Sequence, residues 1–90
     1  MKLAIFQRST SETRPHVIAI LLGEGNWREY SVHRAQEIME HIGMSLKFND
    51  DPVVIPFGEG ESVQVNAEYA GNLVKSLEIA LQEWADYVNG

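Results

Sequence analysis

The chain has 90 residues, of which 44% are hydrophobic and 22% charged, and its net charge is −6. A chain of this length holds one hydrophobic core, so we expect a single domain over residues 1–90, and the absence of cysteine excludes disulfides, thiolate catalysis and cysteine-bound metals. No apolar run approaches the roughly 18–20 residues of a membrane span, which favours a cytoplasmic protein that makes no membrane contact.

Charge is distributed unevenly along the chain. Residues 1–49 contain six basic and five acidic side chains, for a balance of +1, whereas residues 50–90 contain Lys75 against eight carboxylates, for a balance of −7. Binding to nucleic acid or to an anionic membrane depends on clustered Lys and Arg, and the sequence shows no such cluster. The acidic half therefore indicates a protein partner with a basic surface. The simpler alternative is that the acidity only keeps the protein soluble.

The first half of the chain begins with strand signals. Residues 2–7 are short and apolar, a polar loop follows over 9–15, and residues 16–22 are apolar on both faces, which is typical of a central strand. Residues 23–26 (Gly-Glu-Gly-Asn) predict a turn, because glycine adopts positive φ without steric cost. Residues 27–30 are the expected hairpin partner of the central strand.

A helix follows this hairpin. Ser31 is a good N-cap, apolar residues recur at helical spacing after it, and Gly43 is expected to end the helix. We then expect extended chain over 46–48 and again over 53–57. Pro56 lacks the N–H that a ladder needs, so the second of these segments should be an edge strand or end irregularly.

The second half shows the same order of signals. Residues 58–61 predict a turn, residues 62–65 alternate like a strand, and Asn66 is positioned to cap a long helix. The apolar residues of this helix follow one another at spacings of three and four and are Tyr69, Leu73, Leu77, Ala80, Leu81, Trp84 and Val88. We expect this stripe to be core, with Trp84 as a packing residue rather than a ligand-stacking one.

The two halves can be aligned with an offset of 35 residues. Residues 21–42 then match residues 56–77 in their turns, their caps and most of their apolar helix positions. The pattern predicts an α+β fold of order β-ββα-ββα, with one antiparallel sheet of four to five strands and both helices packed on one sheet face. Only four identities over 22 positions support an internal ββα repeat, so common turn and cap chemistry explains the match as well.

The polar motifs do not predict a catalytic, cofactor or metal site. Each Gly-Glu-Gly turn precedes a strand and carries a glutamate, which disfavours a phosphate loop, and no set of oxygen ligands completes a calcium site. His33, Glu37 and His41 share one helical face, but the histidines are eight residues apart, so a solvated face is the favoured interpretation. No Ser-His-Asp or Gly-x-Ser-x-Gly arrangement is present.

The residues that remain indicate an interaction surface. Ile79 lies on the polar face of the second helix, where it makes an apolar centre with a charged rim. Trp27 and Tyr30 form a second candidate beside the first turn. The predicted partner-binding residues are Glu68, Lys75, Glu78, Ile79, Gln82, Glu83, Asp86, Trp27 and Tyr30.

We therefore expect a non-enzymatic protein–protein interaction module. The favoured hypothesis is a small acidic inhibitor, antitoxin, immunity or anti-defence type of protein that blocks a basic partner, for example one that itself binds nucleic acid. Two alternatives stay open. One is a homodimeric structural or accessory subunit of a larger complex, and the other is a small enzyme whose catalytic groups converge only in space.

Overall fold

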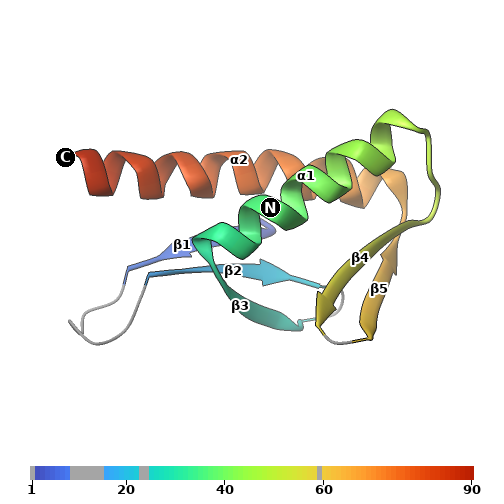
Figure 1. Ribbon diagram of the computed structural model, residues 1–90, viewed down its shortest axis with the longest axis horizontal. Helices are drawn as coiled ribbons and strands as arrows, with labels where there is room; N and C mark the ends of the chain where they lie inside the picture. Colours follow the sequence, from blue (N-terminus) through green and yellow to red (C-terminus); the bar gives the residue numbers. More distant parts are fainter. Residues whose placement is uncertain (1, 9–15, 23–24, 59) are drawn as a thin grey trace.

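The computed structural model describes residues 2–8, 16–22, 25–58 and 60–90, which form an α+β fold (Figure 1). Its elements in chain order are β1 (Ala4–Gln7), β2 (Val17–Leu21), β3 (Trp27–Ser31), α1 (Val32–Lys47), β4 (Val53–Gly58), β5 (Glu61–Val65) and α2 (Ala67–Asn89). The predicted order of elements is confirmed, while the internal repeat stays a prediction. The loop expected over 9–15 and parts of the two glycine-rich turns, at 23–24 and 59, lie outside the described residues.

The strands form two antiparallel sheets, so the prediction of one shared sheet is wrong. β1, β2 and β3 pair in that order, and β4 pairs with β5. An exposed ion pair joins the two sheets, because Arg28 Nη1 of β3 lies 3.8 Å from Glu61 Oε2 of β5.

Both helices lie on the same side of the three-stranded sheet and run in opposite directions (Figure 1). α2 packs along β1 and against α1, and α1 also packs on β4. Two polar contacts tie α2 to the first strands. The Leu3 N–H donates to Ser76 Oγ at 3.2 Å, and the Tyr69 hydroxyl donates to the Leu21 carbonyl.

The hydrophobic core lies between the helices and the sheets, and β2 contributes most to it among the strands. Four consecutive β2 residues, from Ile18 to Leu21, are buried, so both faces of this strand are covered and the prediction of a central strand is confirmed. Among the residues that the structure describes, the largest fully buried side chains are Ile18, Ile20, Ile38, Ile42, Ile55, Leu73, Leu77 and Val53. The apolar positions of α1, β4 and α2 therefore converge on one core with β2.

Helix α1 begins where the sequence predicts and ends later. The Ser31 hydroxyl accepts the Arg34 N–H at 3.1 Å, which confirms the N-cap. The helix continues through Gly43 to Lys47, so the predicted end at Gly43 and the predicted extended segment over 46–48 are both wrong. The reason is packing, since Leu46 lies one turn after Ile42 and packs against the core. This burial outweighs the roughly 1 kcal/mol that glycine costs inside a helix.

The β4–β5 hairpin shows the effect expected from Pro56. β4 pairs with β5 on one side only, and the register shifts between Pro56 and Gly58. Proline has no N–H to donate, so both the edge position and the irregular pairing follow from it. Gly60, in the turn between the strands, has a φ of 74° and uses the conformational freedom of glycine.

Helix α2 carries most of its predicted apolar stripe into the core. Asn66 Oδ1 accepts the Tyr69 N–H at 2.7 Å, which confirms this cap as well. Leu73, Leu77 and Ala80 are buried, and Tyr69 and Leu81 pack against them. Trp84 is only half-buried, and Val88 is 50% exposed, so the prediction that Val88 belongs to the core is wrong. At about 1.5 Å per residue, 23 residues extend about 35 Å, and in the last turn of α2 the Tyr87 ring lies 5.9 Å, between ring centroids, from Phe6 of β1.

Candidate functional site

The seven predicted partner-binding residues of α2 are all exposed, namely Glu68, Lys75, Glu78, Ile79, Gln82, Glu83 and Asp86. Six of them follow one another along the side of α2 that points away from the core, because helical residues three, four or seven apart share a face. We call these six residues, all but Glu78, the outer face of α2. Ile79 near the middle of this face is 57% exposed, which places a large apolar side chain within a charged surface.

The outer face is acidic, and its carboxylates form no ion pair with a basic side chain among the described residues. Within the described residues, ion pairs join Glu61 to Arg28 and Glu37 to His33 and Arg34, and none reaches a carboxylate of α2. The Gln82 side-chain amide donates to Asp86 Oδ1 at 2.9 Å, which orients this carboxylate without neutralising it. An unpaired acidic helix face attracts and orients cationic partners.

A groove between α1 and α2 adjoins the outer face. It has a volume of about 470 Å³ and is lined by Gln36, Met39, Glu40, Glu78, Leu81 and Gln82. The sequence singles out Glu78 and Gln82 from this set but not the three α1 residues, because only tertiary packing brings the two helices together. The one available signal is that polar residues border the apolar stripe of each helix, which many helices share.

The structure separates Trp27 and Tyr30 from the outer face. Both residues lie on β3, at the edge of the sheet opposite to β1, whereas α2 packs along β1. Trp27 is 44% exposed, and Tyr30 is half-buried. Burial raises the pKa of the Tyr30 phenol, and the nearby charges of Arg28 and Arg34 offset part of this rise. The nine predicted residues therefore form two separate surfaces.

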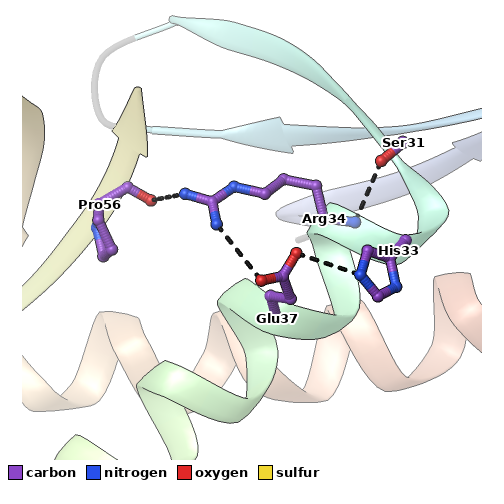
Figure 2. Close-up of polar contacts among 5 residues, drawn as sticks. All are labelled: Ser31, His33, Arg34, Glu37 and Pro56. Carbon is purple, nitrogen blue, oxygen red and sulfur yellow. Dashed lines mark hydrogen bonds and ion pairs between the residues drawn. The ribbon is translucent and has the colours of Figure 1, made fainter. Parts of the chain in front are cut away.

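His33, Glu37 and His41 are all exposed, as expected for a solvated face, although the two histidines have different partners. His33 Nε2 lies 3.5 Å from Glu37 Oε1, and Arg34 reaches both Glu37 and the carbonyl of Pro56 (Figure 2). His41 Nε2 instead lies 3.0 Å from the Val54 carbonyl of β4. In the described ranges, no three His, Asp or Glu side chains gather as they would to hold a metal ion.

Comparison of the chain with protein-family models, with curated proteins and with solved structures finds no match. Helix α2, at 23 residues, has the length of a membrane span, but it carries five charged side chains. None of the helices in the described part of the chain combines the length and apolarity needed to cross a membrane.

Proposed function

We propose that the protein is a cytoplasmic, non-enzymatic interaction module of the inhibitor, antitoxin, immunity or anti-defence type, which blocks a basic protein through α2. The observation that carries this proposal is the outer face, where Ile79 lies among carboxylates that have no basic partner in the described structure. An apolar centre inside a charged rim is the usual anatomy of a protein interface. The charged rim speeds encounter with a basic partner, and the apolar centre slows its release.

A pair of charge-reversal variants tests this proposal. Glu83→Lys with Asp86→Lys reverses the outer face, while Glu29→Lys with Asp50→Lys makes the same change in net charge at exposed positions of β3 and the α1–β4 loop. Lysine near the C-terminal end of a helix is favourable for the helix dipole, so the first variant should fold normally.

The readout is the affinity of a partner captured from the native host, measured by calorimetry at low and high salt. We expect a basic partner whose binding weakens steeply with salt and falls by about tenfold or more in the outer-face variant, and by about threefold or less in the control. A captured partner whose affinity responds neither to salt nor to the outer-face reversal would falsify the proposal.

A separate observation favours the homodimer as a second candidate. Phe48 is 69% exposed and Met44 57%, and the two side chains lie one turn apart at the end of α1. Exposed apolar side chains that gather in this way mark association surfaces. Sedimentation at tens of micromolar should then show a dimer that Phe48→Ser converts to a monomer, and a wild-type monomer at that concentration rules this candidate out.

A further inference from the structure

The groove between α1 and α2 has chemically different ends. Each helix contributes one glutamine and one glutamate a single turn apart, in the order Gln36 then Glu40 on α1 and Glu78 then Gln82 on α2. Because the helices run in opposite directions (Figure 1), the two glutamates lie at one end of the groove and the two glutamines at the other. Neither glutamate forms an ion pair within the described structure.

The bottom of the groove is apolar. Met39 and Leu81 are partly buried and pack against the hydrophobic core, so their remaining exposed surface faces the groove. The groove is open to solvent on its outer side, and its volume of about 470 Å³ leaves room for one long side chain to lie in it. A group that fits this site needs an apolar stem for the bottom and a positive charge for the carboxylate end.

We infer that this groove receives an arginine side chain of the basic partner. The methylene groups of the arginine lie on Met39 and Leu81, and its guanidinium group lies between Glu40 and Glu78. Arginine combines an apolar stem with five N–H donors that match carboxylate geometry, and it is enriched among the residues that dominate interface energetics. The amides of Gln36 and Gln82 can pair with the backbone of the partner at the other end.

The groove and the outer face are continuous, which favours a protein ligand over a free small cation. Gln82 lines the groove and donates to Asp86 of the outer face at 2.9 Å. A basic segment that lies across α2 can therefore place one arginine in the groove while its other cations face Glu83 and Asp86. The inference rests on the proposed function, since it names the group of the basic partner that α2 and α1 recognise together.

Titration of the whole protein with N-acetyl-arginine amide, followed by NMR, tests the inference directly. The matched control ligand is the citrulline analogue, which has nearly the same shape and no charge. We expect saturable shifts of the Met39 methyl group and of the Gln36 and Gln82 side-chain amides, with a dissociation constant on the order of millimolar. Citrulline should leave these signals unchanged.

Isosteric variants test whether the arginine ligand binds at the carboxylate end of the groove. Glu40→Gln and Glu78→Gln should each weaken arginine binding by about fivefold or more, whereas Glu29→Gln on β3 should leave it unchanged. Equal shifts with citrulline, shifts spread over all acidic surfaces, or no shift at all would each overturn the inference.

The partner assay separates this inference from the proposed function. If the Glu83→Lys and Asp86→Lys reversal abolishes partner binding while Glu40→Gln leaves it intact, the proposed function stands and the arginine site is wrong. If neither change affects binding, the proposed function itself fails. Loss of binding in both variants supports both statements.

Discussion

Replacement of Gly43 by alanine tests where helix α1 ends. Gly43 is exposed and lies inside the helix, which continues to Lys47, and a Cβ atom at this position would meet nothing within 4 Å. Alanine is favoured over glycine in a helix interior by about 0.8–1.0 kcal/mol. Gly43→Ala should therefore raise the free energy of unfolding by about 0.5–1 kcal/mol and the Tm by about 2–8 °C. Urea and thermal denaturation followed by circular dichroism measure both quantities.

The opposite result is expected if Gly43 terminates the helix. A terminating glycine adopts the left-handed conformation, where alanine costs about 1–2 kcal/mol. Gly60 provides the matched control, because it too is exposed with nothing near its would-be Cβ, but its φ is 74°. Gly60→Ala should lower the free energy of unfolding by about 1–2 kcal/mol. A loss of stability in Gly43→Ala similar to that in Gly60→Ala would refute the continuous helix.

Three further predictions concern the core, a helix cap and the half-buried Tyr30. Leu73→Ala should lower the free energy of unfolding by about 2–5 kcal/mol, because Leu73 is fully buried. Val88→Ala should lower it by about 0.5 kcal/mol or less, because Val88 is half exposed. Similar losses for the two variants in chemical denaturation would show that Val88 belongs to the core. Asn66→Ala should cost about 1 kcal/mol and Asn66→Gly only a few tenths, and an equal loss from both would contradict the capping role. Burial raises the pKa of Tyr30 above 10.0, so the fold favours the neutral phenol and wild-type stability should fall as pH rises from 10.0 through the folded-state pKa. Tyr30→Phe should show a smaller fall in denaturation curves between about pH 9 and 11, and identical pH dependence in both proteins would argue against the raised pKa.

Signals that depend on neighbours in sequence predict this fold well. The caps Ser31 and Asn66 and the turn glycine Gly60 each satisfy backbone requirements within a few residues. The periodicity of α2 identifies Leu73 and Leu77 as core, because one face of a helix must be buried in a domain this small. Pro56 predicts an edge strand for the same local reason, since proline lacks an N–H wherever it lies.

Predictions that need the position of a distant element are the ones that are wrong. Gly43 is a typical helix terminator, yet the helix continues because Leu46 reaches the core. Val88 continues the apolar stripe of α2, yet it is 50% exposed, whereas the neighbouring Tyr87 packs against Phe6 of β1. The strands divide into two sheets rather than one, and a single sheet would need pairing between strands that lie far apart in the chain.

The candidate site divides in the same way. The outer face of α2 can be read from the sequence alone, because the polarity of one helix determines which of its side chains face water. The groove depends on packing, since Met39 and Glu40 lie 38 or more residues before Glu78 in the chain and face it only when α1 and α2 pack together. The sequence by itself thus determined the elements, their caps and the acidic face. The tertiary structure decided how far each helix extends, how the strands are shared between sheets and which residues of two helices form one binding groove, because these depend on contacts between segments far apart in the chain.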